Sequence, residues 1–237
     1  MNEQINSTLQ RRTLLLVGSA KKEHESTSEA LGSFLLDQLA AQDFATDTRY
    51  VHRALRTHER SAELLDTIDA ADLVVLAFPL YVDSLPYLVT KALEMIAEDR
   101  QRRATPRRPQ FVAIANCGFP EANHNDVALA ICRCFAQEAN LQWAGGLALG
   151  SGGVIGGQTL AEAGGVANIV RQALTLAADA LARQQAIPEE AITLLAKPLI
   201  PYAMYTTIAG IGWRVQALKN HVYTKLNDQP LRDYQTA

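Results

Sequence analysis

The chain has 237 residues, of which 48% are hydrophobic, so it is long enough to bury the core of one sizeable domain. Its formal net charge of −3 gives no reason to expect nucleic acid or an anionic membrane as the main partner. The three cysteines, Cys117, Cys132 and Cys134, lack disulfide or metal-ligand spacing, which is typical of a reducing cytoplasm. The polar segment 1–12 has no signal-peptide core, and we expect a tail there.

The first predicted unit is a buried strand over 13–17, a polar loop that begins at Gly18, and a helix. Leu31, Leu35 and Leu39 recur at helical spacing after the loop. A helix N-terminus offers unpaired backbone N–H groups, so this arrangement predicts an anion site at the first crossover. The candidate phosphate ligands in the loop are Ser19, Lys21, Ser26, Thr27 and Ser28.

The same loop has a plain structural interpretation. Ser26 and Glu29 have the spacing of a capping box, which only begins a helix. The loop contains neither Gly-x-Gly-x-x-Gly nor Gly-Lys-Ser/Thr, so it is neither a dinucleotide fingerprint nor a nucleoside-triphosphate loop. Hydroxyl groups in place of glycines suit a single terminal phosphate. The loop alone does not decide between a phosphate site and a helix cap.

The remaining sequence alternates strands with helices. The clearest strand is 72–78, a near-continuous apolar run of the kind found in parallel sheets. A polar, loosely alternating segment over 44–51 is typical of a sheet edge. The other predicted elements are a helix over 61–71, a helix capped by Ser84, a strand over 110–116, a helix capped by Asn125 or Asp126, a strand over 143–149, and helical segments over 160–185 and from Pro188.

The helix after Asn125 carries an expected apolar face of Val127, Ala130, Ile131 and Cys134, with Phe135 beside it. Cys132 and Cys134 are two residues apart, so we expect them on different sides of the helix, as core residues and not metal ligands.

Two further segments could be read as ligand sites. Five arginines lie within 100–109, but the segment leads from a helix into a strand, at the edge of a parallel sheet where ligands do not bind. We therefore expect a solvated basic loop. The glycine-rich run 150–157 follows the fifth strand, not the first, and we interpret it as a flexible loop beside a site.

The segment 186–237 is predicted to be a C-terminal helical extension, packed on the domain or on a second subunit. Its stretch from Pro198 to Trp213 is free of charge. Sixteen residues with two prolines and two glycines are too few for a membrane span. A docking or subunit-contact helix is the favoured interpretation.

Five strands alternating with helices predict an α/β fold with a doubly wound parallel sheet. The strand order 2-1-3-4-5 has its switch point between the first and third strands. That order places the loop after Gly18 beside the loop after Phe78, which has Tyr81 at its centre. A phosphate site beside a flat aromatic wall suits flavin mononucleotide (FMN), and segment 116–120 would close the remaining side.

The segments 18–21, 26–28 and 78–86 together resemble the flavodoxin-like NAD(P)H-dependent FMN reductase family, over roughly residues 13–157. The resemblance implies a flavodoxin-like domain over 13–185. It implies that the FMN phosphate is bound by Ser19, Ser26, Thr27 and Ser28 with Lys21, that the isoalloxazine ring rests on Pro79, Leu80, Tyr81 and Val82, and that Asn116, Cys117, Gly118 and Phe119 lie near its pyrimidine edge.

The function implied is a cytoplasmic FMN-dependent oxidoreductase that takes hydride from NADH or NADPH and reduces a small acceptor such as a quinone, nitro, azo or metal compound. The cofactor does the chemistry, which agrees with the lack of a general-base or nucleophile motif. The uncharged stretch 198–213 and the family habit lead us to expect a homodimer. The alternatives are an FMN electron carrier or sensor without NAD(P)H turnover, and a flavin-free scaffold that binds a protein partner.

Overall fold

The computed structural model describes residues 10–229, so most of the predicted tail lies outside the described residues. The chain divides by its internal contacts into two units, Met1–Leu199 and Ile200–Ala237. Arg12, assigned to the tail from the sequence, is the first residue of the first strand.

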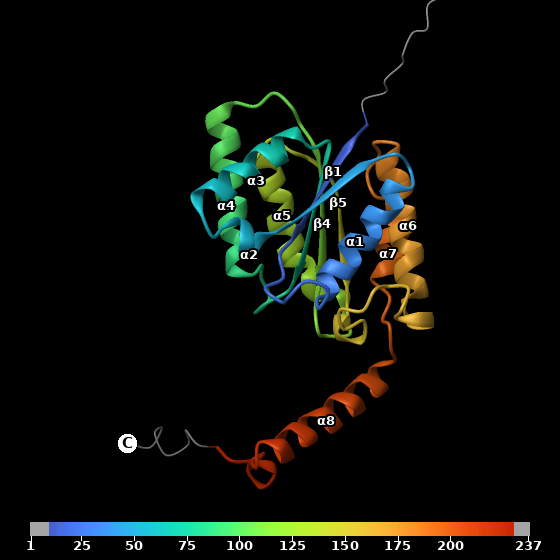
Figure 1. Cartoon of the computed structure of the whole chain (residues 1–237). Coiled ribbons are helices and arrows are strands. Elements are labelled where there is room, and N and C mark those ends of the chain that lie inside the picture. The colour runs from blue at the N-terminus through green and yellow to red at the C-terminus, as the bar shows by residue number, and fades with distance from the viewer. Residues whose placement is uncertain (1–9, 230–237) are drawn as a thin grey trace, which may run out of the picture. The chain divides into compact units, whose positions relative to one another are not determined.

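The first unit is built on a five-stranded sheet in which every neighbouring pair of strands is parallel. The strand order is β2-β1-β3-β4-β5, which confirms the predicted order and α/β class (Figure 1). The three central strands are almost completely buried because helices cover both faces. The strands are β1 (Arg12–Val17), β2 (Ala45–Tyr50), β3 (Leu73–Pro79), β4 (Gln110–Asn116) and β5 (Gln142–Leu149).

Side chains alternate between two separate hydrophobic cores, one on each face of the sheet. Leu15 and Val17 of β1 contribute to one core, and Leu14 and Leu16 contribute to the other. The first core is closed by α1 (Thr27–Ala40), α6 (Asn168–Ala182) and α7 (Glu189–Leu195) (Figure 1). The second is closed by α2 (Val51–Ala54), α3 (His58–Ala70), α4 (Tyr87–Arg103) and α5 (Asp126–Glu138).

Helix α7 belongs to the sheet domain, although the sequence assigned residues after 185 to the extension. Ala191 and Leu195 are fully buried in the first core. Ile187, just before α7, donates its N–H to Ala144 O of β5 at 2.8 Å. The boundary between the two units lies after Leu199 because α7 still covers the sheet.

The expected apolar face of α5 is wrong. Val127 is 62% exposed, and Ala130, Ile131 and Cys134 are also exposed. The helix packs on the sheet through smaller side chains and one aromatic ring, namely Ala128, Cys132, Phe135 and Ala136. Phe135 packs edge-on against Phe111 of β4, with ring centroids 5.2 Å apart. Cys132 is buried and Cys134 exposed, so the two lie on different sides of the helix as their spacing predicted, but the expectation that Cys134 is a core residue is wrong.

Two local expectations also fail. Helix α4 begins at Tyr87 with Pro86 as its cap, and Ser84 instead belongs to a tight turn. Arg100 lies in α4 and is buried, not solvated. Its guanidinium group donates to Ala139 O at 2.6 Å and to Arg107 O at 2.7 Å, and it pairs with Asp69. Arg100 therefore joins α4 to the loops around it at the edge opposite the candidate site.

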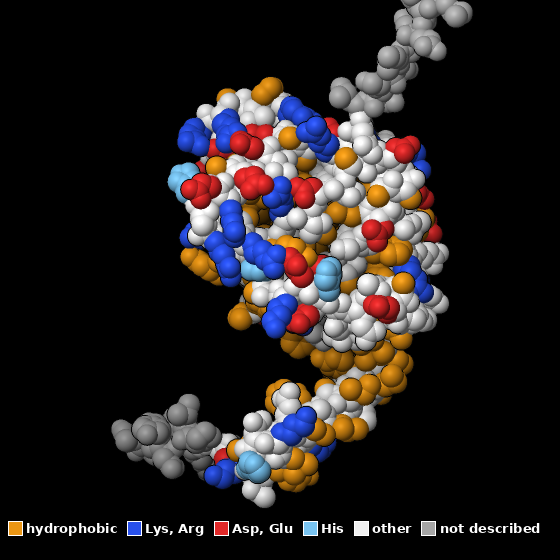
Figure 2. Space-filling view, in the orientation of Figure 1, with side chains coloured by type: hydrophobic (Ala, Val, Ile, Leu, Met, Phe, Trp, Pro, Cys, Tyr) orange, Lys and Arg blue, Asp and Glu red, His pale blue; other side chains and the backbone are white. Residues whose placement is uncertain are grey.

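The second unit contains helix α8 (Tyr202–Lys219) and one 3₁₀ turn, η4 (Tyr223–Lys225). The first unit also has three 3₁₀ turns: η1 (Ala122–Asn125), η2 (Gly152–Val154) and η3 (Gly164–Ala167). Hydrophobic side chains run along α8, with basic residues toward its C-terminal end (Figure 2). Among residues 10–229, no helix has the length and apolar character needed to cross a bilayer.

Candidate functional site

The candidate site lies where β1, β3, β4 and β5 end, at the carboxyl edge of the sheet. Each loop there is held by a neighbouring strand: Gly18 N donates to Ala77 O at 2.8 Å, and Leu80 N donates to Asn116 O at 2.8 Å. A Cβ atom on Gly18 would lie 2.8 Å from the Cβ of Phe78, so only glycine lets the first loop leave β1 here. The sheet thus brings the sequence-predicted segments to one edge.

The hydroxyl groups of the first loop keep most of their donor capacity. Ser19, Ser26 and Ser28 are buried, and each Oγ atom accepts a hydrogen bond: from Lys21 N at 3.3 Å, Glu29 N at 3.2 Å and Asn116 Nδ2 at 2.7 Å, respectively. A serine hydroxyl that accepts still has its own proton to donate. Thr27 differs, because its Oγ1 donates to Gly152 O at 2.8 Å.

The N-terminus of α1 adds backbone donors to this set. The first intrahelical bond runs from Ala30 N to Ser26 O at 3.0 Å, so the N–H groups of Thr27 and Ser28 precede it. Lys21 is exposed at the rim of the loop. Three hydroxyl protons, two backbone N–H groups and one ammonium group form a donor set that fits a phosphate.

The second segment forms a tight hairpin after β3. Tyr81 and Ser84 exchange two backbone hydrogen bonds, of 3.0 and 3.1 Å, across Val82 and Asp83. Both central residues have positive φ, 50° and 55°, as a type I′ turn requires. A β-branched residue is strained in this conformation. Tyr81 is 48% exposed and Val82 98% exposed, while Pro79 and Leu80 are half-buried, so this segment presents an apolar surface.

The third segment follows β4 and is fixed from within. Asn116 is buried and donates to both Ser28 Oγ and Phe78 O, which ties β4 to α1 and β3. Burial raises the pKa of the Cys117 thiol, so it stays protonated at neutral pH. Phe119 is half exposed and stacks on His124 at 4.5 Å, whereas Gly118 faces open space. Within 116–120, only Gly118 and Phe119 offer an accessible surface.

The glycine-rich segment 150–157 is held by close backbone contacts, which the sequence did not reveal. A Cβ atom on Gly152 would lie 2.8 Å from Asn116 Oδ1, and one on Gly157 would lie 2.3 Å from the carbonyl carbon of Glu25. Gly157 also has a φ of +85°. The only signal of this bracing in the sequence was the number of glycines in 150–157. The segment therefore braces both the first loop and the β4 loop.

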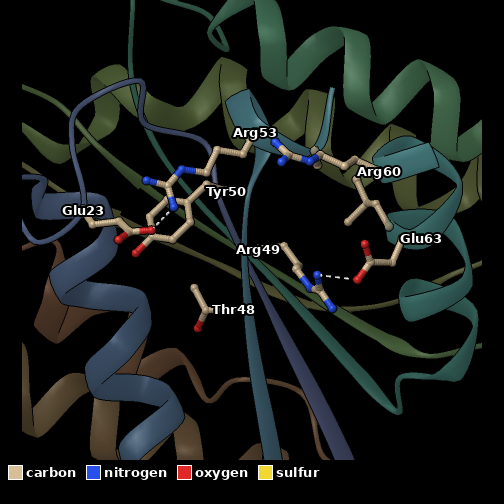
Figure 3. Close-up of a pocket in the computed structure, with 9 residues that line it drawn as sticks. Glu23, Thr48, Arg49, Tyr50, Arg53, Arg60 and Glu63 are labelled. Carbon is tan, nitrogen blue, oxygen red and sulfur yellow. Dashed lines mark hydrogen bonds and ion pairs between the residues drawn. The ribbon is translucent and has the colours of Figure 1, made fainter. Parts of the chain in front are cut away.

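A second set of contacts, also missed from the sequence, anchors the first loop to the end of β2. Tyr50 donates its hydroxyl to Glu29 Oε1 at 2.6 Å, and His24 N donates to Glu29 Oε2 at 2.8 Å. Burial and the Glu29 carboxylate raise the pKa of Tyr50. Arg53 pairs with Glu23 and lies over the Tyr50 ring, 5.1 Å from its centroid (Figure 3). Arg53 thus compensates the negative charge that Glu23 brings to the first loop.

These residues line part of a cavity of about 300 Å³ at the end of β2 (Figure 3). Three arginines point into this region, but Arg49 pairs with Glu63 at 2.8 Å and with Asp47 at 2.9 Å. Arg53 is paired as described above, so carboxylates compensate two of the three arginines. Its lining residues are Glu23, Thr48, Arg49, Tyr50, Arg53, Ala54, Arg60, Glu63 and Leu64.

Neither a protein-family model nor a curated protein matches the chain. Solved structures do share its fold. A flavone reductase is 11% identical, with 95% of this chain and 94% of that one covered and a TM-score of 0.56. An FMN-dependent NADH-azoreductase from Bacillus anthracis str. Ames Ancestor, in complex with FMN, is 12% identical, with 73% and 100% covered and a TM-score of 0.52. An NADH:FMN oxidoreductase in its apo form is 16% identical, with 82% and 98% covered and a TM-score of 0.51.

The strand order and these neighbours agree on the fold. The chain has the flavodoxin-like fold, as the sequence resemblance implied. At identities this low, the structural likeness establishes the architecture only, and the activity has to be argued from the site.

Proposed function

We propose that the chain is an FMN-dependent oxidoreductase that takes reducing equivalents from NADH or NADPH. The observation that carries the proposal is the donor set on the first loop, which lies beside the exposed hairpin at the switch point of the sheet. Ligands of open α/β sheets bind at such a switch point. The names of the structural neighbours support the same class of activity.

The residues divide the binding of FMN between its two ends. Ser19, Ser26 and Ser28 would donate to the phosphate, together with the first N–H groups of α1, and Lys21 would supply positive charge. Thr27 supports this loop through Gly152 and offers only its backbone N–H. The phosphate end is therefore built on a helix terminus that is braced from two sides.

The ring end is more open. Pro79, Leu80, Tyr81 and Val82 would support the isoalloxazine, and Phe119 would limit its other edge. Gly118 and Phe119 are exposed, and their backbone N–H groups would donate to the polar pyrimidine edge. Asn116 and Cys117 act from beneath, because both are buried. FMN, when bound, supplies hydride chemistry, so the protein needs no general base of its own.

The first experiment is to titrate the purified protein with FMN and with riboflavin, following flavin fluorescence and the absorption spectrum. We expect FMN to bind at least about 100-fold more tightly, since charge-assisted hydrogen bonds to phosphate are strong. Anaerobic NADPH or NADH should then bleach the bound flavin. Bands that persist would favour an electron carrier, and no uptake of FMN would refute a flavin function.

A pair of glycine variants tests where FMN binds. Gly157→Ala forces a left-handed alanine against Glu25, so we expect the first loop to shift and the Kd for FMN to rise about tenfold or more. Gly153→Ala is the matched control, because nothing lies within 4 Å of its added Cβ. Equal FMN affinities for both variants, each folded by circular dichroism, would place the phosphate elsewhere.

A further inference from the structure

A polar pocket, here called the amino-edge pocket, lies where the strands of the sheet begin. Its volume is about 320 Å³. Gln110 and Gln142 are the first residues of β4 and β5 and pair with each other in the sheet, and Arg11 directly precedes β1. The candidate flavin site lies at the opposite edge, so the two are separate. The residues that line the amino-edge pocket are Arg11, Asp72, Arg107, Arg108, Pro109, Gln110, Gln142 and Gln184.

Gln110 is a buried amide without hydrogen bonds. The residue is 5% exposed, and within residues 10–229 neither its Oε1 nor its Nε2 atom has a hydrogen-bond partner. Val112 and Ile114 of the same strand face the first core, so side-chain alternation places Gln110 on that face, at its amino end. Buried amides are nearly always hydrogen-bonded, because they have lost their bonds to water. Gln110 therefore has a donor and an acceptor that the fold does not use.

Positive charge around the amino-edge pocket is only partly compensated. Arg107 pairs with Asp72 at 2.7 Å, and that carboxylate also accepts from Arg12 N at 2.8 Å. In the part of the chain that the structure describes, neither Arg11 nor Arg108 belongs to an ion pair. Two guanidinium charges are thus left for an anion.

Arg11 is held in place from within the domain. Its Nη1 atom donates to Ala182 O at the end of α6 at 2.9 Å, and its guanidinium carbon lies 4.4 Å from the centroid of the Phe44 ring. Partial burial lowers the pKa of Arg11, since less water solvates the charge. A guanidinium group has five N–H donors, and the carbonyl uses one of them. An arginine positioned in this way loses little side-chain freedom when it binds an anion.

The composition of the amino-edge pocket indicates the class of ligand. A phosphate monoester carries nearly two negative charges at neutral pH, which match Arg11 and Arg108, whereas a carboxylate carries one. The three glutamine amides can each donate to a hydroxyl group and accept from one. Among the described lining residues Pro109 alone is apolar and none is aromatic, so a flat base would find no ring to stack on.

We propose that the amino-edge pocket binds a phosphate monoester of a small polyol, with Arg11 and Arg108 on the phosphate and Gln110 on a hydroxyl group. The volume equals that of roughly ten water molecules, which leaves room for the polyol beside the phosphate. Arg107 stays paired with Asp72 and positions the loop before β4. Part of the basic segment 100–109 thus acquires a binding role at the edge away from the flavin.

The test is isothermal titration calorimetry of the full-length protein with glycerol 1-phosphate, both flavin-free and with saturating FMN. We expect the same Kd in both states, and binding of glycerol and of acetate at least about tenfold weaker. Arg108→Met, an exposed position, should raise the Kd about tenfold or more. Arg12→Met is the matched control, because alternation places this exposed side chain on the other face of the sheet, and its Kd should stay within about threefold.

A second variant separates the two ends of the ligand. Gln110→Leu keeps the size of the side chain, and it should weaken glycerol 1-phosphate about threefold or more while leaving inorganic phosphate unchanged. The proposal is overturned if wild-type protein does not bind glycerol 1-phosphate, if FMN competes with it, or if Arg108→Met binds it as wild type does. Competition by FMN would place the phosphate at the first loop. The flavin-free titration measures the amino-edge pocket even if the chain does not bind FMN.

Discussion

The strained hairpin after β3 makes a direct prediction about stability. Val82→Asn keeps the two backbone bonds between Tyr81 and Ser84, because neither involves the Val82 side chain. That side chain is 98% exposed, so its replacement removes almost no buried apolar surface. The left-handed conformation costs an ordinary residue about 1–2 kcal/mol, and asparagine adopts it more readily than a β-branched residue does.

We therefore expect Val82→Asn to raise the free energy of unfolding by about 1 kcal/mol, or roughly 2–4 °C in Tm for a domain of this size. Thermal unfolding followed by circular dichroism measures the shift. Val127→Asn is the matched control, since Val127 is also exposed but lies in α5 with helical φ. The reasoning is refuted if Val82→Asn leaves Tm unchanged or lower, or if the control raises Tm equally.

Three further predictions concern charge and thiol chemistry. Arg100→Met should destabilise the fold by about 3–5 kcal/mol in urea denaturation, because it removes the donor to the carbonyls of Ala139 and Arg107 and leaves Asp69 with Arg103 alone. The exposed Arg102→Met should cost under about 1 kcal/mol. The pKa of Tyr50 is raised above its ordinary 10.0, so the protonated hydroxyl contributes fully to the free energy of unfolding below pH 10, and this contribution is lost as the pH rises further. Tyr50→Phe should therefore flatten the alkaline decline in stability. Native protein should alkylate rapidly only at Cys134, since burial raises the pKa of Cys117, and Cys134→Ser should abolish the fast reaction.

Each of these has a result that contradicts it. Similar losses of stability for Arg100→Met and Arg102→Met would mean that the buried contacts of Arg100 do not stabilise the fold more than an exposed ion pair does. An unchanged slope of stability against pH in Tyr50→Phe would mean that this tyrosine ionises as readily when folded. A fast thiol reaction that survives in Cys134→Ser would show that another cysteine is accessible.

The sequence predicted the sheet well because its strands carry their own signal. Leu73–Pro79 and Gln110–Asn116 are apolar runs buried on both faces, so composition alone marks them. The α5 face was assigned to the wrong side because larger side chains, such as Val127, were taken as the core. The close packing of Ala128 and Cys132 on the sheet depends on tertiary contacts, which hydrophobicity does not report.

The candidate site shows a similar limit. Its segments could be predicted, since strand order places the loops together. Which atoms still have a proton to donate could not, because that depends on partners far away in sequence: Asn116 for Ser28, and Gly152 for Thr27. Glycines that allow close backbone approach look in sequence like glycines that give flexibility, so the bracing role of Gly157 was also missed.

The two cores on opposite faces of the sheet have a consequence for how mutations combine. Leu15 and Leu16 are adjacent in the chain but belong to different cores, and Leu15 packs over Gly32 of α1. Substitutions at this pair should act almost independently in a double-mutant cycle, whereas Leu15 and Leu35 share a core and should show epistasis. In this fold the face of the sheet, and not distance along the chain, sets which core substitutions are expected to depend on one another.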